Sequence, residues 1–203
     1  MCCGHAFLVS LRPRLVSGAG MKALTTQEID KLLADVSDAR LHAAILLGFR
    51  HGLRASEICG LRWADVDIAG KTIICRRLKN SITTTQPLSM PEIDALQTLL
   101  EGRGASEWVF PSHRAGAGGK RGRMSRITFY RLFKEACRQS GIADKSPHGL
   151  KHALAYAMVD ANISLPIIQR ALGHKSISST AVYAQATDRM AGEAISKALD
   201  GGK

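Results

Sequence analysis

The sequence predicts one α+β domain that is mainly helical, with a small antiparallel β-sheet packed at one side. Two observations favour this class. Along most of the chain, apolar residues recur three and four positions apart, which places them on one face of a helix. The stretch 71–88 is instead rich in β-branched residues around a short turn, which is typical of a hairpin. With 203 residues, 45% of them hydrophobic, the chain is long enough for one domain with a sizeable core.

The first helices have defined ends in the sequence. Thr25 and Glu28 have the spacing of a capping box, and Leu24 stands where a hydrophobic staple would pack. A second, more apolar helix is predicted over 41–51 and ends at Gly52, a residue common after helix C-termini.

Arg54 stands at the entrance of a third, short helix, and the hairpin follows it. Glu57 is three positions on, so its carboxylate can hold the guanidinium in place; a surface ion pair of little energetic weight is the alternative. The hairpin strands are predicted over 71–77 and 82–88, which puts Lys79 at the tip. A lysine at a hairpin tip is most often only solvated, so position alone gives it no role.

The next segments continue the helical pattern. Helices are predicted over 92–100 and 126–140, and a last weak helix over 190–199; the glycine-rich basic stretch 112–124 is expected to be a mobile loop. The inward face of the 126–140 helix is predicted to consist of Ile127, Tyr130, Phe133 and Cys137.

The stretch from 147 to 183 gathers the side chains best suited to handling a phosphate. His148 and Lys151 are three apart near a predicted helix start, where backbone N–H groups and the helix dipole favour an anion. Gly173 is a C-cap residue that places His174 directly on the following turn, and Tyr183 comes after a run rich in Ser and Thr. Each of these residues alone is more often structural, and it is their combination that suggests a site.

Charge and cysteine content limit the classes of function. Lys and Arg total 28 against 17 Asp and Glu, a formal net charge of +11 that favours a polyanionic partner, nucleic acid ahead of a membrane surface. A basic soluble protein with no such partner is the alternative. The five cysteines are an odd number without metal-ligand spacing, which fits a reducing compartment. We predict that the protein uses neither a metal ion nor a cofactor. No apolar run approaches the roughly 18 residues of a membrane span.

Two motifs carry a family resemblance. G-L-R-A-S-E-I-x-x-L-R-W surrounds Arg54, and L-G-H-x-S-I-x-S-T-x-x-Y occupies 172–183. With the hairpin lysine Lys79 and the histidine box at His148 between them, the chain resembles the catalytic domain of the tyrosine recombinases, the phage integrase family, over 24–187.

The resemblance implies a site-specific DNA recombinase or integrase. In such enzymes the tyrosine, here Tyr183, attacks a DNA phosphodiester, forms a 3′-phosphotyrosyl link and expels a 5′-hydroxyl; a second 5′-hydroxyl then reverses the step without ATP or metal. By motif position, Arg54 stabilises the phosphate, Lys79 is the general acid for the leaving oxygen, His148 assists proton transfer and His174 donates to the phosphate. The catalytic set that the resemblance implies is Arg54, Lys79, His148, Lys151, His174 and Tyr183.

One departure from the family concerns Lys151. The family usually reads H-x-x-R, whereas this chain has lysine three residues after His148, and lysine lacks the planar fork of arginine. Losing one preorganised donor lowers the reaction rate on the order of 10²–10³-fold. Because lysine retains the charge, its loss of rate is expected near the lower limit. His152 is expected to pack rather than to compensate. The alternatives are a catalytically weak or inactive DNA-binding relative and a topoisomerase-like nickase.

The other departure concerns domains and partners. Residues 1–22 are interpreted as a flexible leader and 23–203 as the catalytic domain, so the helical DNA-clamp domain that usually precedes it in the family is expected to be absent. The alternatives are a fragment of a longer protein, a minimal single-domain enzyme and the remnant of a degraded gene. The expected partner is double-stranded DNA, with a homo-oligomer (tetramer) on DNA through the C-terminal segment. The expected location is cytoplasmic, and nucleoid-associated when bound to DNA.

Overall fold

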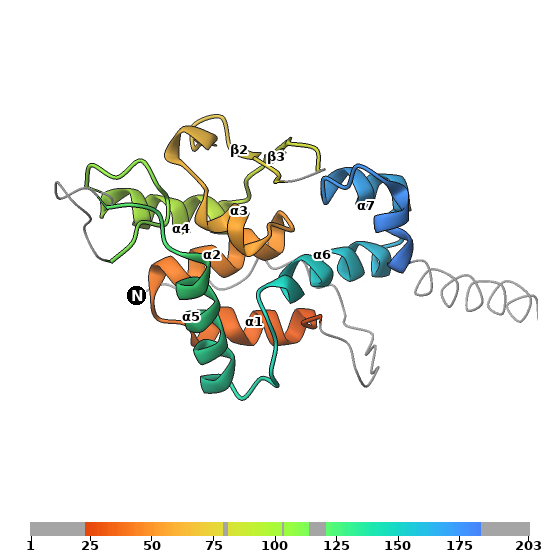
Figure 1. Cartoon of the computed structure of the whole chain (residues 1–203), viewed down its shortest axis with the longest axis horizontal. Coiled ribbons are helices and arrows are strands. Elements are labelled where there is room, and N and C mark those ends of the chain that lie inside the picture. Colours follow the sequence, from red (N-terminus) through yellow and green to blue (C-terminus); the bar gives the residue numbers. More distant parts are fainter. Residues whose placement is uncertain (1–22, 79–80, 103, 114–120, 184–203) are drawn as a thin grey trace, which may run out of the picture.

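The computed structural model describes residues 23–78, 81–102, 104–113 and 121–183. This part of the chain is mainly helical with one small antiparallel sheet at its edge, which confirms the predicted class (Figure 1). The helices are α1 (Thr26–Asp35), α2 (Ala39–Arg50), α3 (Ala55–Cys59), α4 (Met90–Glu101), α5 (Arg126–Gln139), α6 (His148–Asp160) and α7 (Leu165–Ala171), with 3₁₀ segments η1 (Trp63–Asp65), η3 (Ile177–Ser179) and η4 (Ala181–Tyr183).

The predicted capping box at the start of α1 is confirmed. The Glu28 backbone N–H donates to Thr25 Oγ1 at 3.1 Å, and the Thr25 backbone N–H donates to Glu28 Oε2 at 2.8 Å. Leu24, the predicted staple, is buried. Two N–H groups of the first turn therefore have local partners, as the sequence pattern requires.

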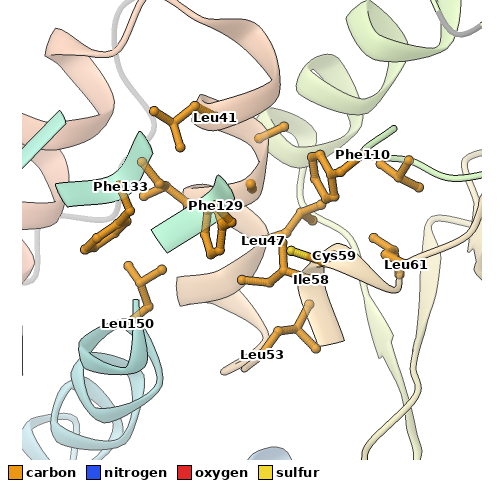
Figure 2. Close-up of a cluster of buried hydrophobic side chains, with 14 of the residues drawn as sticks. Leu41, Leu47, Leu53, Ile58, Cys59, Leu61, Phe110, Phe129, Phe133 and Leu150 are labelled. Atoms are coloured by element: carbon orange, nitrogen blue, oxygen red, sulfur yellow. The ribbon is translucent and has the colours of Figure 1, made fainter. Parts of the chain in front are cut away.

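Helix α2 is the centre of the main core. It packs against α1, α3, α4, α5 and α6, and nearly every residue from Leu41 to Gly48 is buried. Figure 2 shows Leu47 of α2 among Ile58 of α3, Phe129 of α5 and Leu150 of α6. Each such side chain contributes about 1.5–3 kcal/mol when it is fully buried. This cluster fixes α3 and the start of α6, the two elements that carry the first predicted site residues.

The sheet has three strands in the order β1 (Val66–Asp67), β2 (Thr72–Cys75) and β3 (Thr84–Pro87), all antiparallel. The predicted hairpin is β2–β3, with shorter strands than the sequence indicated. β1 was not predicted, because two residues are too few to show an alternating pattern. Lys79, predicted at the hairpin tip, lies outside the described residues, as does the predicted 190–199 helix.

The prediction for the inward face of α5 was partly wrong. Ile127 is 80% exposed and Tyr130 is 45% exposed, whereas Phe129 is fully buried. Both sets of residues fit a helical spacing and share Phe133 and Cys137, so spacing alone could not decide between them. As a result, the first turns of α5 present Ile127 and Tyr130 to solvent beside Arg54 and His148.

A second, smaller cluster lies at the far end of α6. The C-terminal half of α6 packs there against α7 and η4, on the right of Figure 1. Its buried members are Ala155, Val159, Ile168, Leu172 and Tyr183. Helix α6 therefore connects the main core to the segment that carries Tyr183. Among the described helices, none has the length and apolar character that a membrane span needs.

Candidate active site

Arg54 is the N-cap residue of α3 and is held by Glu57. The Arg54 backbone N–H donates to Glu57 Oε2 and its Nη1 donates to Oε1, both at 2.9 Å. The Glu57 side chain is only 1% exposed, against 34% for Arg54, so the alternative of a weak surface pair is wrong. Burial alone would raise the pKa of Glu57, but N–H donors from Arg54 and Leu78 and the charge of Arg77 together lower that pKa.

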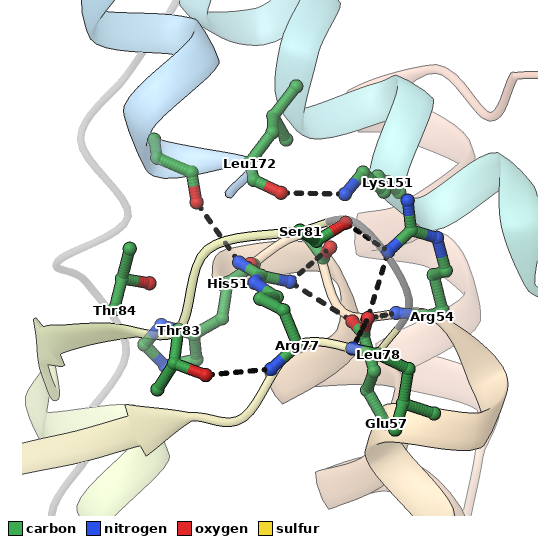
Figure 3. Close-up of polar contacts among 12 residues, drawn as sticks. His51, Arg54, Glu57, Arg77, Leu78, Ser81, Thr83, Thr84, Lys151 and Leu172 are labelled. Atoms are coloured by element: carbon green, nitrogen blue, oxygen red, sulfur yellow. Dashed lines mark hydrogen bonds and ion pairs between the residues drawn. The ribbon is translucent and has the colours of Figure 1, made fainter. Parts of the chain in front are cut away.

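The residues on either side of the hairpin tip both contact this pair. The Leu78 backbone N–H donates to Glu57 Oε1 at 3.2 Å, and Arg54 Nη1 donates to Ser81 Oγ at 3.2 Å (Figure 3). Ser81 also forms an isolated antiparallel bridge with His174. The segment that contains Lys79 is thus fixed at both ends to the Arg54 region.

His148 begins α6 and lies beside Arg54. The two side chains line the same open hollow of about 460 Å³, whose far wall includes Arg126 and Arg131 of α5. Partial desolvation of the His148 ring, and then the charges of Arg54 and Lys151, lower the pKa of His148. At neutral pH the imidazole is therefore mainly neutral and able to exchange a proton.

Lys151 follows His148 by three positions on α6, as predicted, but its side chain is buried. Its side chain is 2% exposed, and Nζ donates to the Leu172 carbonyl oxygen at 2.7 Å. Burial, and then the charges of Arg77 and Arg54, lower the pKa of Lys151 to about 7. The Lys151 Nζ thus lies at the C-terminal end of α7, where the helix dipole favours the charged form.

His174 is placed by Gly173, as the sequence indicated. Gly173 has φ +67, the left-handed conformation of a residue that follows a helix C-terminus. His174 is 8% exposed, and its Nδ1 lies 3.0 Å from Thr180 Oγ1. Burial, and then the charges of Lys151, Arg54 and Arg77, lower the pKa of His174 to about 4, so the ring is neutral at physiological pH. Thr180, in the run rich in Ser and Thr before Tyr183, is therefore a hydrogen-bond partner of His174.

Tyr183 lies in η4 with its hydroxyl against His152. The phenol is 2% exposed, and its oxygen lies 2.9 Å from His152 Nδ1. Burial, and then Tyr156, raise the pKa of Tyr183 to about 12. His152, which was expected to pack, lies against the rings of His148 and Tyr183 and also contacts the Tyr183 hydroxyl. His148, His152 and Tyr156 are four residues apart on α6, a spacing that places all three on one stripe and was visible in the sequence.

The described members of the predicted set converge. The ring centroids of His148 and His152 are 4.6 Å apart, and His152 contacts the Tyr183 hydroxyl, which links Tyr183 to the hollow that Arg54 lines. The pKa of His174 responds to Arg54, Lys151 and His152 together. Lys79 lies outside the described residues. Within the described ranges, no group of three His, Cys, Asp or Glu side chains is placed to hold a metal ion.

Comparison with known proteins identifies the class. The sequence pattern of the Phage integrase family matches residues 22–190. The type 1 fimbriae regulatory protein FimB of Escherichia coli K12 is 36% identical over 170 residues, which cover 79% of this chain and 82% of FimB. The tyrosine recombinase XerA of Pyrococcus furiosus is 31% identical over 180 residues, which cover 87% of this chain and 62% of XerA.

Two solved structures share the fold. A crystal structure of XerA recombinase superposes with a TM-score of 0.73 at 26% identity, covering 90% of this chain and 66% of that chain. A lambda integrase dimer bound to a COC′ core site superposes with a TM-score of 0.63 at 25% identity, covering 79% and 47%. The chain belongs to the phage integrase family, the tyrosine recombinases, and has the catalytic fold of that family. Its function is therefore site-specific DNA recombination.

Proposed function

We propose that Tyr183 is the nucleophile with which this protein cuts and rejoins DNA through a 3′-phosphotyrosyl intermediate. The observation that carries the proposal is the position of the Tyr183 hydroxyl, 2.9 Å from His152 and linked through His148 to the hollow lined by Arg54. The net charge of +11 and the DNA-bound structure of a similar integrase support double-stranded DNA as the substrate.

In this mechanism the phenol oxygen of Tyr183 attacks phosphorus and the bond from phosphorus to the 5′ oxygen breaks. The electron pair leaves on the 5′ oxygen, which takes a proton; Lys79 is the proposed donor by motif position. His152 Nδ1 is placed to accept the phenol proton, and Arg54 offsets the charge that develops on the non-bridging oxygens. Attack by a 5′-hydroxyl on the phosphotyrosine reverses these changes and rejoins the strand.

The phenol must become accessible before it reacts. Tyr183 is 2% exposed and burial raises its pKa to about 12, so it is protonated and covered by α6 and α7. We infer that DNA binding is coupled to an outward movement of η4. In the described arrangement, before this movement, burial lowers the pKa values of His152 and His174.

A weak or inactive DNA-binding relative is the second candidate, and Lys151 favours it. Its Nζ is occupied by the Leu172 carbonyl oxygen, and a single ammonium group cannot grip two phosphate oxygens as a guanidinium does. We propose that lysine at this position slows the reaction without abolishing it. The tetramer on DNA through the C-terminal segment also stays a proposal, since residues 184–203 lie outside the described ranges.

The test is covalent capture on DNA. We expect nicked suicide duplexes, built from the genomic sequence around the gene, to yield a protein–DNA adduct on a denaturing gel with the protein on the 3′ phosphate. Tyr183→Phe, which retains the buried ring and removes only the hydroxyl, should lose the adduct and keep its DNA affinity. Tyr156→Phe is the matched control, because Tyr156 packs edge-on against Tyr183 with ring centroids 5.1 Å apart.

Three outcomes would contradict the proposal. An adduct that persists in Tyr183→Phe would mean that another side chain is the nucleophile. DNA binding with no adduct, in both the natural protein and Lys151→Arg, would favour the binding relative. Relaxation of supercoiled plasmid without site preference would indicate the topoisomerase-like nickase.

A further inference from the structure

Arg77, two residues after the end of β2, is a buried arginine for which the sequence pattern indicates no role. Its side chain is 0% exposed, and its guanidinium contacts three separate segments (Figure 3). Nη1 donates to the Gly52 carbonyl oxygen at 2.8 Å and to Glu57 Oε2 at 3.2 Å. Nη2 donates to the carbonyl oxygens of His51 at 2.7 Å and Ala171 at 3.0 Å.

These partners explain how the charge is tolerated in the interior. A buried cation is costly unless hydrogen bonds and an opposite charge compensate it. Here the C-terminal ends of α2 and α7 supply carbonyl groups and the negative ends of two helix dipoles, and Glu57 supplies the charge. The planar fork of arginine reaches all of these acceptors at once, which a lysine ammonium cannot do.

On one side, Arg77 fixes the carboxylate that holds Arg54. Glu57 Oε2 accepts from both Arg77 Nη1 and the Arg54 backbone N–H, while Oε1 accepts from Arg54 Nη1 and the Leu78 backbone N–H. Of the two described hydrogen bonds of the Arg54 guanidinium, one therefore goes to the carboxylate that Arg77 contacts and the other goes to Ser81.

On the other side, Arg77 holds the end of α7 that precedes His174. The Ala171 carbonyl oxygen accepts from Arg77 and also from Gln86 Nε2 at 2.9 Å. A Cβ atom added to Gly173 would come within 2.9 Å of Arg77 Nε and 2.7 Å of the Ile82 carbonyl oxygen, so this turn lies directly against the arginine. The Ile82 backbone N–H closes the contact by donating to the Gly173 carbonyl oxygen at 2.9 Å.

We propose that Arg77 is a positioning residue for strand cleavage: it sets Arg54 through Glu57 and His174 through Ala171 and Gly173, without touching DNA. The inference rests on the proposed function for its kinetic consequence. A misplacement of about 1 Å in either group is sufficient to slow a reaction by about a hundredfold. If Arg77 only stabilised the fold, its loss would reduce the amount of folded protein but not the rate of each folded molecule.

The kinetic test compares Arg77→Met and Arg77→Lys with Arg76→Met. Arg76 is the matched control, since it is the neighbouring arginine, is 65% exposed and pairs with the buried Asp65 at 2.6 Å. At saturating suicide DNA, we expect the rate constant of adduct formation to fall by about tenfold to a hundredfold in both Arg77 variants. The final amount of adduct per folded protein and the DNA dissociation constant should change little. Arg76→Met should leave the rate constant unchanged.

Arg77→Lys covers the case in which the methionine variant does not fold, because it retains the buried charge. A rate constant that is unchanged in the lysine variant, with only the amount of adduct or the thermal midpoint reduced, would overturn the proposal.

Hydrogen exchange gives a readout that does not need activity. We expect the amide of Ile82 to exchange faster in the Arg77 variants, while the amide of Phe129, in the main core, keeps its protection. If the natural protein forms no adduct, the proposed function fails, and the role of Arg77 is judged on exchange alone. A selective effect at Ile82 would then support it. No effect, or an equal effect at Phe129, would overturn it.

Discussion

Arg54 and Tyr183 lie in parts of the molecule that are packed differently. Arg54 opens α3, whose Ile58 is buried in the large cluster around α2, and its partner Glu57 is buried beneath it. Tyr183 belongs to the small second cluster at the far end of α6. Because local stability follows the number of buried apolar contacts, the Tyr183 segment is expected to open at a lower free energy than the Arg54 segment.

The polar contacts between these two parts follow the same division. The end of α7 is held by Arg77, Gln86 and Lys151, which all donate to its last carbonyl groups. Beyond His174, the side-chain hydrogen bonds that tie η3 and η4 back to the fold include one between Thr180 and His174 and one between Tyr183 and His152. The comparison indicates that Arg54 lies in the more extensively packed part of the molecule, and we expect the segment that carries Tyr183 to open more readily.

The largest expected effect comes from Glu57→Gln. Removing one partner from a buried ion pair leaves the other charge uncompensated, so the free energy of unfolding should fall by about 3–5 kcal/mol. Urea unfolding followed by circular dichroism measures it. Glu107→Gln, which alters an exposed pair with Arg62, should change the midpoint little. A small loss in Glu57→Gln would mean that the Arg54 part is less rigid than its hydrogen bonds indicate.

Two isoleucines probe the packing difference directly. Ile58→Ala should lower the global free energy of unfolding by about 2–5 kcal/mol, because both the side chain and its cluster are fully buried. Ile168→Ala, in the second cluster, should act mainly locally and speed hydrogen exchange of α7 and η4 amides. Equal global losses for the two variants would show that the two clusters unfold as one unit.

A smaller effect is expected from Lys151→Arg. A guanidinium at this position can donate to the Leu172 carbonyl oxygen and still present a second donor toward a phosphate, so adduct formation should become about tenfold faster. Lys175→Arg, an exposed lysine just after His174, is the control. A slower Lys151→Arg would mean that this pocket is shaped for lysine.

The last comparison concerns the pH dependence of stability. The pKa of Lys151 is lowered from 10.5 to about 7, so between these values the unfolded chain binds a proton that the folded protein does not. The contribution of this group to the free energy of unfolding therefore rises with pH in that window, by at most about 1.4 kcal/mol per pH unit.

The pKa of His51 is raised to about 9: burial lowers it, and hydrogen bonds to Cys75 and Glu92 more than offset this. Its contribution has the opposite sign and is lost as pH rises through 9. The measurement is thus the difference between the natural protein and Lys151→Met at pH 7 and pH 9. A difference that does not change with pH would contradict the shifted pKa of Lys151.

Much of the fold was predictable because its signals are local. The Thr25–Glu28 capping box, the pairing of Arg54 with Glu57 and the left-handed Gly173 all depend on residues within a few positions of one another. The order of the site motifs also indicated which residues would converge.

The parts that the sequence did not reveal depend on distant contacts. Arg77 and Ala171 are 94 positions apart, and no periodicity relates a residue after a strand to the end of a helix that far away. His152 and Tyr183 are 31 positions apart. The spacing of four residues on α6 was visible in the sequence, but the contact of His152 with Tyr183 was not. Likewise, the inward face of α5 depends on the packing of Phe129 in the main core, which involves residues distant in the sequence.

The two hydrogen bonds to the Ala171 carbonyl oxygen have a consequence for which substitutions the molecule tolerates. Both Arg77 and Gln86 bind the main-chain oxygen of Ala171, which every amino acid at that position would present. Exchanging the methyl group of Ala171 for another small side chain would leave both hydrogen bonds in place. A change at Arg77 or Gln86 would instead remove one of the two donors. Substitutions in α7 are therefore expected to leave the position of this helix end unchanged, whereas the hairpin residues that donate to it cannot be exchanged freely.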